Sequence, residues 1–468
     1  MPLELPQLIA DSSSNLLAAR NQMGWTLGFH IVLACFGVAF PAIMLIAEYR
    51  GRRRDDAEAL LLARRWSKAV AVLFAVGAVS GTVLSFEFGL LWPGMMDRFG
   101  DAFGIAFAIE GIFFFLEAIF IAIYIYGWNR LPGWAHFWSG VPIAISGIGG
   151  ALSVIAANAW MNTPAGFTLG PDGRVADADL VDVIFNTSTF HEFVHMWVAA
   201  YIVTGFLVAS VYAVAMLRGR RDRYHRLGFL IPFTVAAIAA PIQIVVGDFV
   251  ARDVYEDQPA KFAAMECVYE SGPDQPERLG GICTDGEVKG DISIPGANSL
   301  LAGFSTDTEV TGLNSIPADE RPPTPTTIHL AFDAMVAIGF ALLGLALWFA
   351  IAWRRKRNLP RTPWFLRAAA AAGVASVIAL ESGWMVTEIG RQPWIVHGFM
   401  RTEEAVTPAE GIWWVFAFTL AIYVGLGLIT AVVLRGMARR WREADEAEPE
   451  LAAPYSPPPP PPKPETAP

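Results

Sequence analysis

The chain has 468 residues, of which 54% are hydrophobic and 17% are charged, and its mean hydropathy is +0.42. Soluble domains carry roughly 25% charged residues, so this composition argues against an ordinary soluble protein and favours a membrane bundle. The net charge of −10 argues against a basic surface that binds nucleic acid. Three cysteines are too few for a disulfide scaffold.

The apolar residues are gathered into long runs. A helix needs about 20 mainly apolar residues to cross a bilayer, and nine stretches meet this requirement. They are residues 24–48, 69–92, 103–128, 137–160, 190–217, 228–247, 329–353, 368–388 and 411–434. We therefore expect an all-α integral membrane protein, a bundle of nine transmembrane helices.

Lys and Arg are concentrated in alternate connections between these stretches. The basic clusters lie within residues 50–68, 218–226, 354–367 and 435–442. With nine spans, all four clusters fall on the same side of the membrane, and cytoplasmic connections carry the excess of Lys and Arg. We expect the N-terminus outside and the C-terminus inside.

One outer connection, residues 248–328, is far longer than ordinary loops, which rarely exceed about 12–15 residues unless they are functional or disordered. It contains Cys267 and Cys283, for which a disulfide is permitted outside the membrane. We expect residues 1–247 to form helices 1–6 and residues 329–435 to form helices 7–9. Residues 436–468 should form a disordered, Pro-rich cytoplasmic tail.

Ionisable side chains inside the expected spans are costly and are candidates for function. Glu110 and Glu117 are seven positions apart, which places both carboxyls on one stripe of a helix, about 10 Å from each other. The other such residues are His30, His191, Glu192, His195, His329, Asp333, Glu381 and Glu388. As a set, they indicate a bundle interior that handles protons, metal or both.

Two hypotheses account for His195. Residues 191–195 spell HExxH, which on a helix places two imidazoles on one face with Glu192 as the general base of a zinc site. An intramembrane zinc metalloprotease is therefore one candidate. Alternatively, His195 is an axial ligand of a low-spin haem and Met335 is the second ligand, since such iron takes two axial ligands.

Further segments distinguish these hypotheses. Residues 390–394 (GRQPW), with Glu381, Trp384 and Glu388 upstream, resemble the signature of subunit I of the cytochrome bd quinol oxidases. Residues 108–117, 157–161, 193–195 and 261–266 also resemble segments of that family, in the same order along the chain. The resemblance extends from about residue 15 to residue 435.

The resemblance implies roles for individual residues. His195 and Met335 match the iron ligands of the low-spin b haem, and His30 and Glu388 match iron ligands of the two haems at which oxygen is reduced. Glu110 and Glu117 match acids near that haem pair, and Lys261 and Glu266 match quinol-oxidation residues. Trp384 matches a tryptophan between the haems, and Arg391 matches an arginine that compensates negative charge.

The implied protein is a terminal oxidase subunit in the bacterial cell membrane. It would oxidise quinol at the outer face and reduce O2 to water with protons from the inside. Its implied cofactors are two b-type haems, one low-spin and one high-spin, and haem d or a third b haem in its place. Its implied partners are a membrane-embedded subunit II and a small single-span subunit.

Three features depart from the family pattern. Asp333 stands where a basic residue is expected near the low-spin haem, and His191 matches no known ligand position. The outer loop, called the Q loop in this family, is at the short end of the family range.

Overall fold

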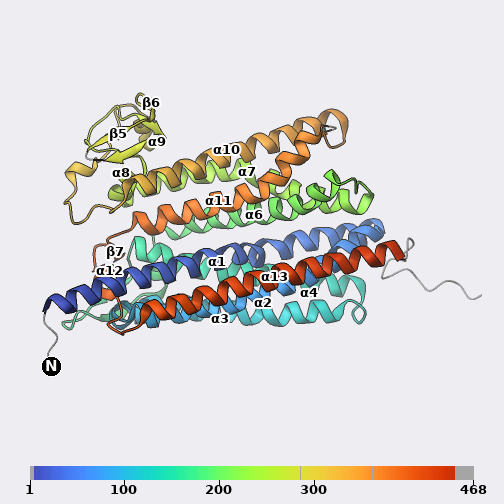
Figure 1. Ribbon diagram of the computed structural model, residues 1–468, viewed down its shortest axis with the longest axis horizontal. Coiled ribbons are helices and arrows are strands. Elements are labelled where there is room, and N and C mark those ends of the chain that lie inside the picture. The colour runs from blue at the N-terminus through green and yellow to red at the C-terminus, as the bar shows by residue number, and fades with distance from the viewer. Residues whose placement is uncertain (1–4, 285, 361, 448–468) are drawn as a thin grey trace, which may run out of the picture.

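The computed structural model describes residues 5–284, 286–360 and 362–447 (Figure 1). Within these residues, nine helices are long and apolar enough to cross a membrane, and each corresponds to one expected span. They are α1 (Leu5–Arg54), α2 (Ala57–Leu91), α3 (Pro93–Gly127), α4 (Gly133–Asn162), α6 (Thr189–Leu217), α7 (Arg223–Asp257), α10 (Pro325–Lys356), α11 (Pro363–Gly390) and α13 (Ile412–Ala447). The predicted fold class is confirmed.

Several helices extend beyond the expected boundaries. Because α7 reaches Asp257 and α10 begins at Pro325, the connection between them covers residues 258–324 rather than 248–328. Helix α13 continues to Ala447, so the tail expected from residue 436 begins with helix, and residues 448–468 lie outside the described part. The i,i+4 ion pair Arg439–Glu443 (3.5 Å) is of the kind that supports an exposed helix end.

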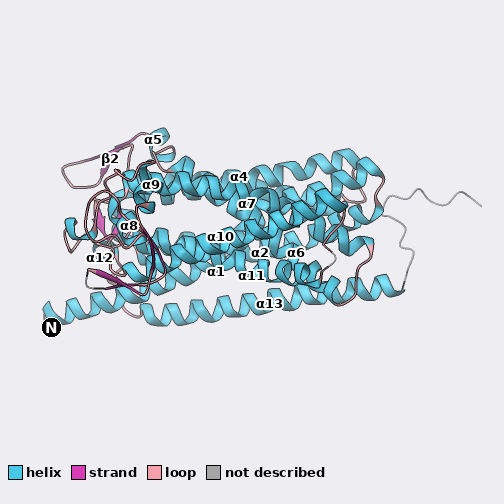
Figure 2. Ribbon diagram, turned by 90° about the horizontal axis from the view of Figure 1, so that it is seen from above, coloured by secondary structure: helices cyan, strands magenta, loops and turns pink. Residues whose placement is uncertain are grey.

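The long helices form two groups. Helices α1 to α4 pack on one another with α13 against α1, and helices α6, α7, α10 and α11 form the second group. Figure 1 shows these groups as two layers, and Figure 2 gives the perpendicular view. Helix α1 also contacts α6 through a buried cluster that includes Cys35, Ala39, Ala200 and Val203, and this contact joins the groups.

The shorter elements gather at the end of the bundle where α1 begins, here called the loop end (Figure 1). Those between α4 and α6 are β1 (Phe167–Leu169), β2 (Val175–Ala178) and α5 (Leu180–Ile184). Those between α7 and α10 are α8 (Pro259–Met265), β3 (Glu277–Leu279), β4 (Ile282–Thr284), β5 (Glu287–Lys289), β6 (Ile292–Ile294), α9 (Ala297–Gly303) and η1 (Leu313–Ser315). Those between α11 and α13 are β7 (Trp394–Val396), β8 (Met400–Arg401) and α12 (Thr402–Ala405).

The strands form four two-stranded antiparallel sheets: β1–β2, β3–β6, β4–β5 and β7–β8. Cys267, just after α8, and Cys283 in β4 form a disulfide. The disulfide thereby ties the end of α8 to the β4–β5 hairpin.

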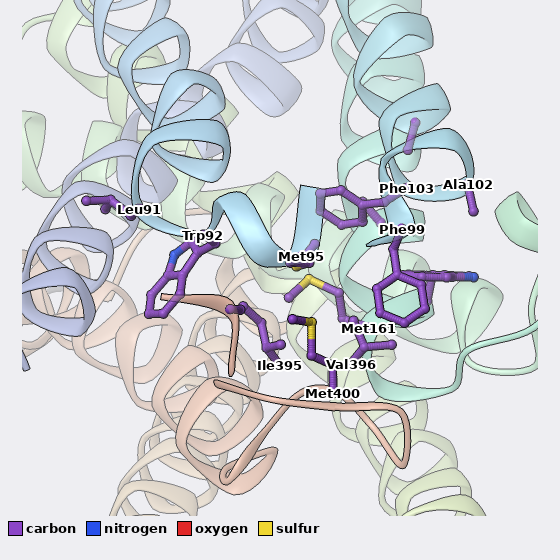
Figure 3. Close-up of a cluster of buried hydrophobic side chains, with 14 of the residues drawn as sticks. Leu91, Trp92, Met95, Phe99, Ala102, Phe103, Met161, Ile395, Val396 and Met400 are labelled. Carbon is purple, nitrogen blue, oxygen red and sulfur yellow. The ribbon is translucent and has the colours of Figure 1, made fainter. Parts of the chain in front are cut away.

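A buried apolar cluster anchors the segment after α11 to the loop end of the first helix group. Figure 3 shows Ile395, Val396 and Met400 of this segment beside Met95 of α3 and Met161 of α4. All five side chains are at most 6% exposed. The packing fixes residues 390–396 against α3 and α4, and therefore fixes the position of the GRQPW sequence.

Helices α1 and α4 approach closely at a glycine, as small residues permit in membrane bundles. A Cβ atom at Gly147 would lie 2.8 Å from the carbonyl oxygen of Gly37, whereas one at Gly150 would find its nearest neighbour, Cβ of Phe113, at 3.8 Å. The backbone contact at Gly147 leaves no flexible side chain to move aside.

We predict that Gly147→Ala lowers the thermal stability of the purified protein, because it forces α1 away from α4 at a cost of about 1–3 kcal/mol. Gly150→Ala, in the same helix, is the matched control and should leave the melting temperature unchanged or slightly higher. Equal melting temperatures for the two variants would contradict the close contact.

Candidate functional site

An ion pair lies where α11 ends. Arg391 donates from Nη2 to Oε2 of Glu388 at 2.5 Å, and Nδ2 of Asn158 on α4 donates to the other carboxylate oxygen at 2.5 Å. The Arg391 residue is only 5% exposed. Its Nε and Nη1 atoms are buried and have no hydrogen-bond partner among the described residues. This guanidinium therefore has donors available for a further anionic group.

The adjoining Gln392 ties this segment to two other elements. Its Oε1 accepts hydrogen bonds from Arg20 on α1 at 2.6 Å and from the Thr402 hydroxyl at 2.8 Å. The GRQPW sequence is thus held at the loop end by apolar packing on one side and polar contacts on the other.

Lys261 of α8 reaches into the same region. Its side chain is buried against Gly390, where a Cβ atom would lie 2.7 Å from Cγ of Lys261, and its Nζ donates to Oδ1 of Asn162 at 2.9 Å. Burial lowers the pKa of Lys261 to about 8, although the nearby Glu192 opposes the shift. Asn162 in turn lies 3.3 Å from Glu192 and 3.2 Å from Asn158. A continuous polar chain therefore links Lys261 to Glu388 and Arg391.

Glu266, at the end of α8, faces a different set of neighbours. It is 4% exposed, and its surroundings contain Glu277 of β3, Asp333 of α10 and Asn298 of α9. Burial raises the pKa of Glu266 well above its ordinary value, and the negative charges of Glu277 and Asp333 raise it further. Lys261 on α8 and Glu266 directly after it, both expected to be quinol-oxidation residues, thus contact separate groups.

Asp333 is turned toward the loop. Its Oδ2 accepts a hydrogen bond from the backbone N–H of Gly280 at 2.5 Å. His329, one turn earlier, is fully buried and places its ring nitrogens 2.8 Å from the carbonyl oxygen of Met265 and 3.0 Å from that of Gly280. Both residues hold the loop to α10.

His195 and Met335 lie on α6 and α10, in opposite walls of the second helix group, each beside a glycine. The Gln243 amide lies 3.2 Å from both ring nitrogens of His195, and a Cβ atom at Gly247 would lie 3.5 Å from its ring. A Cβ atom at Gly383 of α11 would lie 2.9 Å from Sδ of Met335. A larger residue at Gly383 would collide with the Met335 sulfur, and one at Gly247 would touch the His195 ring, so both side chains pack directly against glycine.

In the first helix group, His30 of α1 contacts the Ser80 hydroxyl through Nδ1 at 2.9 Å. Glu117 of α3 is 8% exposed and faces Gly37, and its Oε1 is buried without a hydrogen-bond partner among the described residues. Glu110 lies on the same helix and is partly buried. Trp384 of α11 packs beside the cluster that joins the two groups.

The zinc hypothesis for HExxH finds no support. His191 is turned toward Asp253 of α7, 3.3 Å away, and its side chain is 40% exposed, whereas His195 is buried beside Gln243. Among the described residues, the one group with metal-ligand spacing is Cys267, Cys283 and His329, and its two sulfurs form the disulfide. The HExxH residues therefore lack a third ligand in the described part of the chain.

Sequence reasoning overlooked several residues of this region. Asn162 follows Asn158 by one helical turn, a spacing that could have marked it, since residues i and i+4 share a helix face. Gln243, Glu277 and Asn298 carried no comparable signal, because only the tertiary structure brings α7, β3 and α9 to these sites.

The chain is similar to known proteins over most of its length. The family described as "Cytochrome bd terminal oxidase subunit I" matches residues 18–441. The chain is 35% identical over 427 residues to the "Putative cytochrome bd menaquinol oxidase subunit I" of Bacillus subtilis (strain 168), covering 90% of this chain and 96% of that protein. It is 30% identical over 408 residues to the "Cytochrome bd ubiquinol oxidase subunit 1" of the same organism, covering 84% and 86%.

A solved structure of a bd oxidase has a similar fold. The fold matches a chain of the bd oxidase from Geobacillus thermodenitrificans with a TM-score of 0.85 and 35% sequence identity, covering 91% of this chain and 98% of that chain. The likeness thus extends over nearly the whole bundle.

We predict that Arg391→Gln destabilises the protein by about 1.5–3 kcal/mol, because it removes a charged hydrogen bond from the Glu388 carboxylate, whose side chain is 27% exposed. Arg174→Gln is the control, since the Arg174–Asp97 pair has side chains 56% and 59% exposed and should contribute at most about 1 kcal/mol. Thermal unfolding of both variants tests the difference, and a melting temperature for Arg391→Gln equal to that of the control would argue against the buried pair.

Proposed function

The chain belongs to the cytochrome bd terminal oxidase subunit I family and is a quinol oxidase of the bacterial membrane; from this premise we propose that its loop end faces outside and oxidises quinol, while O2 is reduced to water with protons drawn from the opposite end. One observation carries the proposal. The polar chain from Lys261 to Glu388 lies at the loop end of the bundle. Glu110 and Glu117, the acidic stripe of α3, are spaced along the helix toward the opposite end of the bundle.

Haem is the cofactor of this family, and the residues present suit it. We infer that His195 and Met335 hold a low-spin b haem, and that His30 and Glu388 hold the high-spin b haem and haem d, or a third b haem. The glycines at 247 and 383 allow the His195 ring and the Met335 sulfur to lie against the neighbouring helices, and the two unpartnered nitrogens of Arg391 suit a haem propionate. When bound, the haems carry electrons from quinol to O2 and bind the oxygen.

At the loop end, Lys261 and Glu266 are the proposed quinol residues. A carboxyl beside the quinol hydroxyl can accept its proton, and such general-base assistance contributes about 10²–10⁴-fold to a rate. Lys261, with a pKa near 8, can donate a hydrogen bond to a quinol or quinone oxygen. Glu266 is the proposed base.

Protons for oxygen reduction are proposed to enter along α3. Tyr124 continues the spacing of Glu110 and Glu117 by seven more residues, and its hydroxyl donates to Glu48 at 2.5 Å. Glu48 also accepts hydrogen bonds from Arg52 and lies 2.7 Å from His136. This fully buried group of α1, α3 and α4 lies toward the end opposite the loop, and it supplies hydrogen-bonding groups where the acidic stripe ends.

Subunit I of this family pairs with a subunit II. Among the nine spanning helices of the described chain, α13 and α3 have the smallest buried shares, 11% and 17% of their most apolar windows. We propose that subunit II packs against the exposed sides of one or both of these helices. If α3 takes part, Glu110 and Glu117 lie close to the interface between the subunits.

We predict that Met335→Leu abolishes the low-spin haem signal in the reduced-minus-oxidised spectrum while carbon monoxide binding to the reduced protein persists. The reason is that leucine has the volume of methionine but no sulfur ligand. Met385→Leu, on the exposed side of α11, is the control and should keep both signals. Loss of carbon monoxide binding alone in Met335→Leu would contradict the assignment.

We predict that Glu117→Gln slows reoxidation of the fully reduced enzyme by O2 by about 100-fold, the scale of a lost proton-transfer group. Reduction of the haems by quinol should keep its rate in this variant. Glu403→Gln, an exposed residue of α12, is the control. Stopped-flow spectra separate the two half-reactions, and an unchanged reoxidation rate would refute the role of Glu117.

A further inference from the structure

Two acidic side chains meet beside the end of α8. Glu266 is almost fully buried, and its Oε2 is buried with no hydrogen-bond partner among the described residues. The Glu277 carboxyl, partly exposed in β3, is hydrogen-bonded to that of Glu266. The pair therefore has one buried oxygen free to accept a hydrogen bond from a hydroxyl and one side close to solvent.

The surrounding elements hold this pair in place. Strand β3 is fixed by its antiparallel pairing with β6, where Glu277 lies opposite Ile294. Glu266 directly precedes Cys267, which is joined to β4 by the disulfide. Gly280, three residues after Glu277, is bonded to both Asp333 and His329. Because β3 is attached at both ends, the Glu277 carboxyl cannot move far from Glu266.

Two carboxyls in contact and out of water do not both ionise, since like charges at this separation repel strongly. Burial raises the pKa of both groups, but the hydrogen bond from Glu266 lowers that of Glu277, whereas the charges of Glu277 and Asp333 raise that of Glu266 further. Glu266 therefore carries the shared proton, and Glu277 carries the negative charge.

The other groups that face the pair are either engaged elsewhere or do not titrate. Asp333 accepts the Gly280 N–H, and the ring nitrogens of His329 face backbone carbonyls. The Asn298 amide, 1% exposed, is neutral and does not titrate. Lys261 points away toward Asn162. Of these neighbours, Glu277 is the one in direct contact with Glu266 that can take up its proton.

We propose that Glu277 is a positioning and relay residue for quinol oxidation, which receives the proton of Glu266 while Glu266 receives the proton of the quinol. This inference rests on the proposed quinol site. In the step, the quinol O–H bond breaks and an O–H bond forms at Oε2 of Glu266. The proton on the other Glu266 oxygen moves to Glu277, and the quinol is left as its anion. Glu277 then loses its proton to water, and rotation of the Glu266 carboxyl, which turns its remaining proton back toward Glu277, returns the pair to its starting state.

The relay explains how a protonated carboxyl can serve as a base. Glu266 alone would be neutral and deeply buried, and it would release an accepted proton slowly. With Glu277 beside it, Glu266 accepts the quinol proton on one carboxyl oxygen and releases a proton from the other. The first oxygen faces the substrate, and the second leads through Glu277 to solvent.

The test uses the purified enzyme with its partner subunit and the variants Glu277→Gln, Glu277→Asp and Glu266→Gln. For Glu277→Gln we expect kcat for quinol to fall by about 10-fold, less than the roughly 10²–10⁴-fold effect of a group that itself takes the substrate's proton, with KM unchanged. Its kcat–pH profile should shift to lower pH, because removing the Glu277 charge removes one cause of the raised pKa of Glu266. Glu277→Asp, which keeps the carboxyl, should recover much of the rate.

Three controls isolate the effect. Glu287→Gln changes an exposed acid of the same loop and should have the wild-type rate and pH profile. The haem spectrum after dithionite reduction should be unchanged in every variant, which shows that the bundle is intact. Reoxidation of the prereduced enzyme by O2 should also be unchanged, because that half-reaction does not use the quinol site.

The outcomes separate this inference from the proposed function. The relay would be overturned if Glu277→Gln had the wild-type kcat and pH profile while Glu266→Gln lost activity. That result would leave the proposed quinol site intact. Normal quinol oxidation in both variants would overturn the quinol site itself. A fall in rate without any shift of the pH profile would reduce Glu277 to a structural residue and would also overturn the relay.

Discussion

A charged side chain in the apolar interior of a membrane bundle needs a partner within the protein, because neither lipid nor water is present to solvate it. The chain meets this requirement with compact groups rather than isolated pairs. Glu48 is surrounded by Arg52, Tyr124 and His136, and Glu388 by Arg391 and Asn158. Some buried polar atoms still lack hydrogen-bond partners among the described residues, and a few of them lie where we propose a cofactor, a substrate or a proton.

Four of the unpartnered atoms lie where the proposed chemistry needs them. Two nitrogens of Arg391, one oxygen of Glu117 and one oxygen of Glu266 are buried without hydrogen-bond partners among the described residues. Leaving such a group unsatisfied costs about 1–3 kcal/mol. The attachment of the loop to α10 and the anchoring of β7 in the cluster of Figure 3 provide the rigidity that keeps these atoms apart from alternative partners.

Much of this fold could be predicted from the sequence, because the length and apolar character of a spanning helix are local properties. The ends of the helices were harder to predict, because α7 and α13 continue past their apolar runs into polar residues that still form helix. Within the site, Glu388 and Arg391 share one motif and were foreseen together. The separation of Lys261 from Glu266, and the contact of Glu266 with Glu277, depend on how the loop folds back onto α10, which no local pattern records.

The placement of the acids has an energetic consequence. If quinol protons leave at the loop end and the protons for water enter from the other end, each electron transferred separates charge across the membrane without any pump. Moving one charge across 100 mV is worth about 2.3 kcal/mol, so back-leakage between the two acidic regions would dissipate that energy. The groups of α3 and of the Q loop must therefore remain unconnected for protons. Apolar packing between the two helix groups, with Cys35, Ala39 and Val203 in one buried cluster, is where we expect this separation to arise, so the core that joins the helix groups would also insulate the two proposed proton sites.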